Sequence, residues 1–397
     1  MLQRPVELSL RLQMQLRILG LVLMSTLPIT MRCAEKDARA SQLDAILTKA
    51  VTPGQPGLAV LVKKDGSVLF QKCYGVGKIR DSAPITPDTD FRLASVTKQF
   101  TAMSVMLLVR DGKLRYDSTL TEILPEFPAY GKSITVRHLL THTSGLPDYE
   151  DLMDRVETSG GSRWSPEHQI QDEEVLALLE RETRGKFAPG TSWAYSNSGY
   201  VVLGLIVARV SGVSYPEFLE RRIFGPLRMR NTLAYRKGKN EIPNRAFGHS
   251  REHGKLVLMD QSSTSATLGD GGIYSNLGDL SKWDDALANH TLLSAEEIEV
   301  ALTPVKLVDG REPHWPVEAD GDNLRPGKPV SYGFGWFLDS YPGHPRMWHS
   351  GTTIGFRNVI ERFTMDHLTI VILCNRTDFD PTALAFKIAD LYLESRR

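Results

Sequence analysis

The fold is decided by residues 91–110, which are FRLASVTKQFTAMSVMLLVR. From Ser95 to Arg110 this stretch is apolar almost all round, which is typical of a helix in the middle of a domain. Asp111-Gly112 follows and ends the helix, because glycine readily adopts the left-handed conformation that often closes a last turn. The sequence therefore predicts a buried helix that begins at Ser95.

Strand patterns lie near the two ends of the chain. The runs of strand length are Gly57–Val62, Ser67–Tyr74, Met347–Ser350, Ile354–Phe363 and Leu368–Cys374. Asp65-Gly66 marks a hairpin turn between the first two runs. Between Asp117 and about Met259 the pattern is mostly helical and includes a second apolar helix, Tyr195–Val210. Further helices are expected at about Ser41–Ala50 and after Pro381.

We expect an α/β (α+β) fold in which the two ends of the chain form one antiparallel sheet flanked by helices. A mostly helical domain would be inserted between the halves of the sheet. The sheet part would take about residues 41–94 and 260–397, and the helical part about 95–259. Together they would form one catalytic unit, 41–397, with a small-molecule site in the cleft between the parts.

The composition excludes several classes of function. The 397 residues include 47 basic and 47 acidic side chains, a balance that favours neither nucleic acid nor an anionic membrane as partner. Three cysteines are too few for a disulfide framework, although Cys73 and Cys374 could pair. There is no C-x-x-C, H-E-x-x-H or Cys/His cluster, so we expect no metal and no cofactor. A small-molecule or short-peptide substrate remains, and the sequence leaves the oligomeric state open.

Residues 1–40 have the pattern of a signal peptide and a short leader. Four arginines against one glutamate give residues 1–34 a charge of +3, and the run Ile18–Met31 is uncharged and apolar. At 14 residues it is too short to span a bilayer and suits the core of a signal peptide. The alternatives are an uncleaved anchor or a misassigned start, and the cleavage site stays open. We expect a periplasmic or secreted protein with no stable membrane span after signal removal.

Ser95-Val96-Thr97-Lys98 is the first candidate catalytic group. The i, i+3 spacing at a helix start places the hydroxyl and the amine on one face, about one turn apart. A serine hydroxyl is a weak nucleophile until a neighbouring base takes its proton, and a lysine with a lowered pKa can be that base. The motif is short enough to arise by chance, but this chain contains it once, before its most apolar helix.

Tyr195-Ser196-Asn197 is the second candidate group. A tyrosine beside a lysine can relay a proton, and an asparagine amide can both donate to and accept from a substrate amide. Tyr274-Ser275-Asn276 repeats the motif. The first copy leads into an apolar helix, whereas the second precedes a polar helix for which Ser275 or Asn276 is a natural N-cap. We therefore interpret the second copy as structural.

His349-Ser350-Gly351 is the third candidate group, at the end of a strand. Glycine there lets a substrate approach the backbone closely, and the next residue, Thr352, can supply an oxyanion N–H beside that of Ser95. A lone His-x-Gly is more often structural.

The order of the three groups is far more specific than any one of them. Ser-x-x-Lys, then Tyr-x-Asn, then Lys/His-x-Gly resembles the signature of the serine β-lactamase-like, penicillin-recognising hydrolases. The resemblance is to the class C branch, which also holds D-peptidases and esterases, and it covers about Leu43 to Leu393. Further matching stretches are FRLA at 91–94, LLTHTSGLP at 139–147, GGIYS at 271–275 and YGFGW at 332–336.

The resemblance implies a role for each site residue. Ser95 would be the nucleophile, Lys98 its base and Tyr195 the proton shuttle. The substrate would meet Asn197, His349, Gly351 and Thr352, the last through its backbone N–H. The family interpretation makes the Leu139–Pro147 stretch, with His142, architectural. Many relatives have lysine at the position of His349, and a mostly neutral histidine lowers the expected activity on anionic β-lactams.

We therefore expect a serine hydrolase that cleaves ester or D-peptide-type amide bonds through an acyl-enzyme on Ser95. The alternatives within the family are a class C-like β-lactamase, a DD-carboxypeptidase, or a penicillin-binding receptor without turnover. A standard α/β-hydrolase would need a G-x-S-x-G elbow, which the chain lacks. A degenerate scaffold without chemistry is disfavoured, because Ser95, Lys98 and Tyr195 are all present.

Overall fold

The computed structural model describes residues 38–316 and 327–394. The predicted signal peptide lies almost entirely outside these residues. A helix covers residues 38–50. Everything below concerns the chain from Val51 onward, which forms one compact unit.

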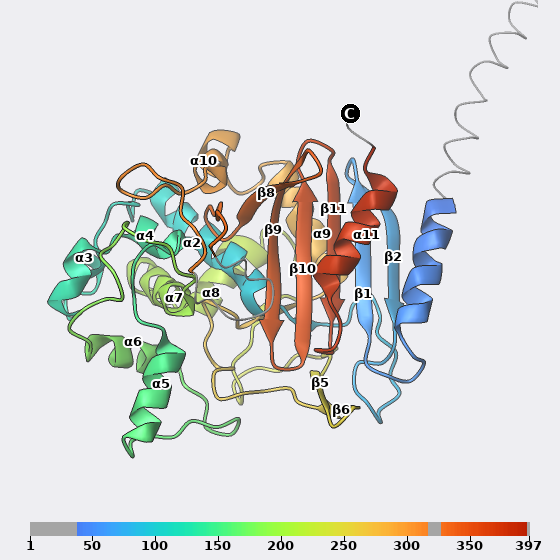
Figure 1. The fold of residues 1–397 in the computed structure, drawn as a ribbon, viewed down its shortest axis with the longest axis horizontal. Coiled ribbons are helices and arrows are strands. Elements are labelled where there is room, and N and C mark those ends of the chain that lie inside the picture. The colour runs from blue at the N-terminus through green and yellow to red at the C-terminus, as the bar shows by residue number, and fades with distance from the viewer. Residues whose placement is uncertain (1–37, 317–326, 395–397) are drawn as a thin grey trace, which may run out of the picture. The chain divides into compact units, whose positions relative to one another are not determined.

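A six-stranded antiparallel sheet joins the two ends of this unit (Figure 1). Its order is β2-β1-β11-β10-β9-β8. The bounds are β1 Leu58–Lys64, β2 Ser67–Tyr74, β8 Phe337–Tyr341, β9 His344–Thr353, β10 Phe356–Phe363 and β11 Leu368–Cys374. The N-terminal hairpin meets the C-terminal strands where β1 pairs with β11, in a register that runs from Leu58 opposite Cys374 to Lys64 opposite Leu368. The predicted sheet is thereby confirmed.

The central strands are covered on both faces. All seven residues of β11 are buried, as are six of the seven residues of β1, which explains why these runs are mostly apolar rather than alternating. Helix α11 (Pro381–Tyr392) packs on β10 and β11, while α9 (Leu277–Ala288) lies behind the sheet against β1 and β11 (Figure 1). The sheet is therefore a rigid layer that holds β9, the strand next to the edge strand β8, in place.

The remaining helices gather on the β8–β9 side of the sheet (Figure 1). They are α2 Lys98–Arg110, α3 Leu120–Ile123, α4 Val136–Leu140, α5 Tyr149–Thr158, α6 Asp172–Glu180, α7 Asn197–Ser211, α8 Tyr215–Leu219 and α10 Ala295–Glu299. Short helical turns are η1 Ala94–Thr97, η2 Ala129–Ser133, η3 Glu220–Phe224 and η4 Val300–Leu302. Two small sheets are formed by β3 Phe91–Arg92, β4 Leu233–Ala234 and β7 Ile273–Ser275, and by β5 His249–Glu252 with β6 Lys255–Leu258. Helices α2 and α7 are largely buried, as their apolar sequences predicted, and they pack against each other.

Two differences from the prediction concern the functional region. The helix expected from Ser95 is divided, because residues 94–97 form the 3-10 turn η1 and the α-helix begins only at Lys98. Ala94 has a φ of 50°, a left-handed conformation that is rare for a residue with a Cβ atom. Strand β8 was not predicted. The structural interpretation of the second Tyr-Ser-Asn motif is confirmed, since Asn276 accepts the Asp279 N–H as the N-cap of α9.

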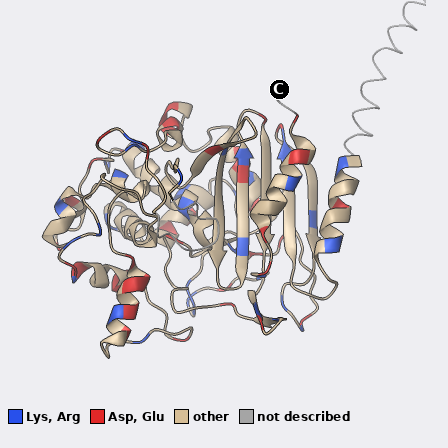
Figure 2. Cartoon of the chain, viewed as in Figure 1, with Lys and Arg blue, Asp and Glu red and all other residues tan. Residues whose placement is uncertain are grey.

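The described residues carry charges of both signs on the same elements, as on α5 (Figure 2). Cys73 and Cys374 are both free thiols, so they do not pair. Of the helices that the structure describes, none is by itself both long and apolar enough to cross a membrane. One bent pair, Asn197–Ser211 with Tyr215–Phe224, passes on length and composition and is bent by 75°.

Candidate active site

Ser95 and Lys98 meet at the junction of η1 and α2. The Nζ atom of Lys98 lies 3.1 Å from the Oγ atom of Ser95. Ser95 is half-buried, whereas the Lys98 side chain has no solvent exposure. The hydroxyl is therefore accessible to a substrate, while the amine that faces it lies inside the protein.

Three oxygen atoms surround the buried amine. Besides Ser95, Lys98 contacts the Oδ1 atom of Asn197 at 2.9 Å and the backbone oxygen of Asp270 at 3.0 Å. Burial lowers the pKa of Lys98 from its ordinary value to about 8, against the opposing effect of nearby carboxylates, first that of Asp270. About a tenth of Lys98 is therefore unprotonated at pH 7, far more than for an exposed lysine, and this fraction can accept the proton of Ser95.

Tyr195 is the third member of the group. Lys98 Nζ lies 4.8 Å from the centre of the Tyr195 ring. Burial raises the pKa of Tyr195 well above its usual value, and the nearby Ser95 hydroxyl opposes this only in part. The Tyr195 hydroxyl is buried and makes no hydrogen bond of good geometry within the described residues. A neutral hydroxyl next to Ser95 that lacks a partner can both donate and accept a proton during a reaction.

Asn197 is the first residue of α7. The helix is capped by Ser196, whose side chain accepts the N–H of Gly199, and this fixes the start of the helix beside Lys98. The Oδ1 atom of Asn197 is engaged by Lys98, so the Nδ2 amide is the part that can donate to a substrate carbonyl.

Strand β9 passes η1 at very short range. A Cβ atom built on Gly351 would lie 2.1 Å from the backbone oxygen of Leu93, so only glycine permits this approach. Thr352 follows directly and is exposed. Strand β9 and η1 are thus in contact beside Thr352, and the oxyanion role of its N–H stays a prediction.

His349 is more enclosed than expected. Its Nδ1 atom lies 2.6 Å from the Ser350 backbone oxygen and its Nε2 atom lies 3.2 Å from the Tyr332 hydroxyl. Because a carbonyl oxygen only accepts, the proton is on Nδ1 and Nε2 accepts from Tyr332. Burial, and next the charge of Lys98, lower the pKa of His349 to about 3. The ring is therefore neutral, and both nitrogens are satisfied within the protein.

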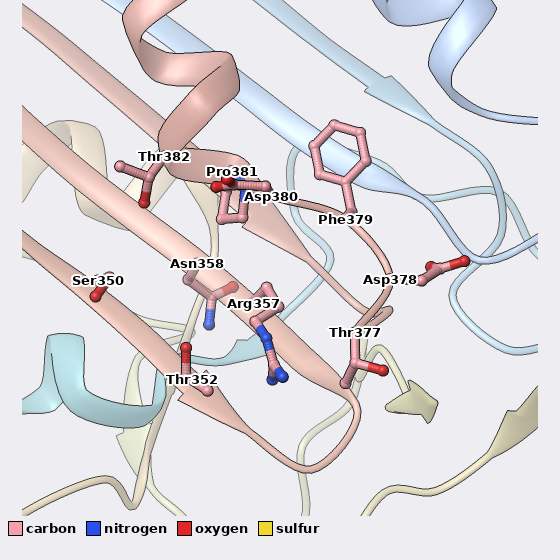
Figure 3. A pocket seen from close by; sticks show the side chains of 10 residues that line it. All are labelled: Ser350, Thr352, Arg357, Asn358, Thr377, Asp378, Phe379, Asp380, Pro381 and Thr382. Carbon is pink, nitrogen blue, oxygen red and sulfur yellow. The ribbon is translucent and has the colours of Figure 1, made fainter. Parts of the chain in front are cut away.

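A cavity of about 300 Å³ lies on the face of β9 opposite to the one that carries His349 and Gly351 (Figure 3). Ser350 and Thr352 line it, because they alternate with His349 and Gly351 along β9. Arg357, the partner of Thr352 in the register of β9 and β10, lines it as well.

Two residues of the site were missed by the sequence analysis. Asp270 contacts Lys98 through a backbone oxygen, for which its side-chain type gives no signal. Tyr332, which bonds His349, lies in the YGFGW stretch that was noted but given no role. Of the seven predicted site residues, Ser95 lies on η1, Lys98 on α2 and Asn197 on α7. Tyr195 lies two residues before α7, and the other three lie on β9.

Comparisons with known proteins agree with this geometry. The family model described as Beta-lactamase matches residues 43–393. The chain is 31% identical over 332 residues to penicillin-binding protein 4* of Bacillus subtilis, which covers 80% of this chain and 68% of that protein. This chain belongs to the β-lactamase family. It is accordingly a serine hydrolase, and the resemblance predicted from the sequence motifs is confirmed.

Solved structures of the family have the same fold. The octameric penicillin-binding protein homologue from Pyrococcus abyssi superposes with a TM-score of 0.71 at 28% identity, over 88% of this chain and 77% of that chain. The D-amino acid amidase from Ochrobactrum anthropi also gives 0.71, at 23% identity, over 90% and 98% of the two chains. At that identity the second likeness is one of fold alone. The predicted fold class is confirmed.

Proposed function

We propose that the protein hydrolyses ester and D-peptide-type amide bonds of small acyl donors through an acyl-enzyme on Ser95. The observation that carries this proposal is the buried Lys98 amine, 3.1 Å from the Ser95 hydroxyl and with a pKa lowered to about 8. A base of that pKa can take the serine proton near neutral pH, where an exposed lysine would be almost fully protonated.

Acylation would use each group once. Lys98 accepts the proton of Ser95 as the Oγ atom attacks the substrate carbonyl carbon. The backbone N–H groups of Ser95 and Thr352 stabilise the oxyanion that forms. Tyr195 passes a proton to the leaving group, which departs as an alcohol or an amine. Water then attacks the acyl carbon and gives one proton to Tyr195, which lost its own to the leaving group, while Lys98 returns its proton to Ser95 Oγ as the carboxylic acid is released.

The neutral His349 bears on the choice of substrate. With a pKa of about 3 it adds no positive charge to the edge of β9, where a lysine would. A carboxylate on the substrate therefore gains little from this residue, and neutral esters and amides are favoured.

A second candidate is a penicillin-acylated enzyme of the β-lactamase or DD-carboxypeptidase type. The relative at 31% identity is named a penicillin-binding protein, and the same three catalytic groups serve a lactam carbonyl as well as an ester. The two candidates differ in the preferred acyl donor rather than in mechanism.

We further propose that the protein is exported to the periplasm or secreted. The support is the basic, then apolar, pattern of its first residues. Cell fractionation, with the N-terminus of the mature protein read by mass spectrometry, tests this. Recovery of the uncleaved chain in the cytoplasm would contradict it.

The function is tested by intact mass spectrometry after exposure to a p-nitrophenyl ester, a D-amino-acid anilide and a penicillin, with turnover followed in parallel. Ser95→Ala should lose both the adduct and the turnover. Ser104→Ala is the matched control, because Ser104 lies in the same segment and its hydroxyl only donates to the Phe100 backbone oxygen. Labelling that persists in Ser95→Ala would refute the assignment, and faster turnover of penicillin than of ester would favour the second candidate.

A further inference from the structure

His142 lies in the Leu139–Pro147 stretch, just beyond α4, and has an unusual backbone. Its φ is 60°, a left-handed conformation in which histidine is one of the few side chains found with any frequency. The residue is buried, with 1% of its surface exposed. A strained and buried histidine next to the catalytic groups requires an explanation beyond packing.

The segment that begins at His142 runs alongside the loop that leads to Tyr195. Backbone N–H groups of the loop donate to backbone oxygens of this segment, at Lys186 to Gly145 over 2.7 Å and at Gly190 to Thr143 over 2.8 Å. The contacts continue to His142 itself. The loop is therefore tied along its length to residues 142–145.

His142 bonds the backbone N–H groups of the residues before and after Tyr195. Its backbone oxygen accepts the N–H of Ala194 at 3.0 Å. The Nδ1 atom of its ring accepts the N–H of Ser196, also at 3.0 Å. The direction of the Cα–Cβ bond of Tyr195 is thus fixed, because the residues before and after it in the chain both bond to His142.

The ring of His142 also packs on the ring of Tyr195. The two ring centres are 4.4 Å apart at an interplanar angle of 35°. Because Nδ1 accepts a backbone N–H, the ring is neutral with its proton on Nε2. Burial, followed by the charge of Lys98 and by His349, lowers the pKa of His142 well below its ordinary value, in agreement with a neutral acceptor.

We propose that His142 is a positioning residue for Tyr195: it sets the Tyr195 hydroxyl against Ser95 by bonding the backbone N–H groups of both neighbouring residues, Ala194 and Ser196, and by supporting the ring. This inference rests on the proposed role of Tyr195 in proton transfer. It gives the LLTHTSGLP stretch a role in the chemistry, in addition to the architectural role expected from the family.

Two substitutions separate the acceptor from the ring. His142→Asn keeps an acceptor oxygen close to the place of Nδ1 and tolerates the left-handed backbone, but removes the ring. His142→Phe keeps a ring against Tyr195 and removes the acceptor. We expect His142→Phe to lower kcat for a p-nitrophenyl ester by about 10- to 100-fold, the scale for a misplaced catalytic group, with KM changed by less than about threefold. His142→Asn should recover most of that loss.

The decisive measurement is a double-mutant cycle on kcat, with the thermal midpoint measured for each variant. In a Tyr195→Phe background, His142→Phe should have almost no further effect, because the hydroxyl that it positions is absent. His138→Phe is the matched control. The Nδ1 atom of His138 also accepts a backbone N–H, that of Thr135 at 3.2 Å, but away from Tyr195, so its kcat should stay near that of the wild type.

Equal losses in the two backgrounds would overturn the proposal, because a general structural defect acts with or without the hydroxyl. So would an unchanged kcat in His142→Phe. Failure of the proposed function has a different signature, namely a Tyr195→Phe variant that retains full activity. If His142→Phe does not fold, His142→Gly, which tolerates the left-handed backbone and removes both the ring and the acceptor, takes its place in the cycle: a loss of kcat that persists in the Tyr195→Phe background overturns the proposal.

Discussion

The Nζ atom of Lys98 lies between two oxygen atoms that come from different parts of the chain, 3.1 Å from Ser95 Oγ and 2.9 Å from Asn197 Oδ1. The first contact is local, within one turn, while the second joins residues 99 positions apart. The amine is thereby oriented without being neutralised by a direct carboxylate contact. This arrangement keeps its pKa low enough for a base and its position fixed for the proton of Ser95.

The first prediction concerns the pH dependence of acylation. Only unprotonated Lys98 can accept a proton, so kcat/KM for a neutral ester should rise with pH through about 8 and then level off. Asp270 raises the pKa of Lys98, so Asp270→Asn should shift this limb to lower pH. Stopped-flow or steady-state kinetics between pH 5 and pH 10 measure both. A profile without a limb near pH 8, or a shift to higher pH, would contradict the role of Lys98.

The second prediction compares Tyr195 with its sequence twin. Tyr195→Phe should lower kcat by about 100-fold or more, the scale for loss of a proton-transfer group. The Tyr274 hydroxyl instead accepts hydrogen bonds from Arg245 at 3.0 Å and Gln261 at 3.2 Å, neither of which is a residue of the proposed site. Tyr274→Phe should cost about 1 kcal/mol of unfolding free energy and leave kcat unchanged. Similar losses of kcat in both would show that the two motifs had been assigned wrongly.

The sequence predicted those parts of the site that depend on residue type and order. Ser95 and Lys98 are three residues apart, and their spacing alone places them together. Tyr195 and His349 were found because the motifs occur in a recognisable order. The apolar ends of the chain likewise predicted that β1 and β11 share one sheet.

Other parts depend on backbone geometry that no residue type reveals. The turn at η1 and the left-handed φ of Ala94 follow from packing against β9, not from local propensity. Asp270 contributes a backbone oxygen to Lys98, and any residue has one. The bonds of His349 to Tyr332 and Ser350 could not be predicted either, and they change its role from an open pocket residue to an enclosed, neutral one.

The third prediction tests the close approach of β9 to η1. In Gly351→Ala the new Cβ atom would meet the Leu93 backbone oxygen at 2.1 Å, so the strand edge must move away from Ser95. Loss of one oxyanion donor costs about 100- to 1,000-fold in kcat, and we expect a loss of that size. Gly278→Ala, in α9 with no neighbour nearer than 3.4 Å, is the control and should retain full activity. A fully active Gly351→Ala variant that is also stably folded would argue against Thr352 as an oxyanion donor.

The last prediction concerns His349 and the charge of the substrate. We expect the wild-type enzyme to prefer a neutral ester over an otherwise identical ester that bears a carboxylate, because the imidazole, with its pKa lowered to about 3, is uncharged near neutral pH. His349→Lys adds an ammonium group at the edge of β9. It should raise kcat/KM for the anionic ester relative to the neutral one by about tenfold, as expected for a charge-assisted contact of about 1.4 kcal/mol. The new charge would also lie near Lys98 and lower its pKa, so the pH limb near 8 should move to lower pH in the same variant.

His344→Lys provides the control on the same strand, because His344 bonds Asp366 at 2.8 Å and a lysine there would be neutralised by that carboxylate. A shifted pH limb without any change in substrate preference would mean that the added charge faces Lys98 and not the substrate. A preference for the anionic ester in the wild type would point instead to a basic side chain other than His349 that binds the carboxylate.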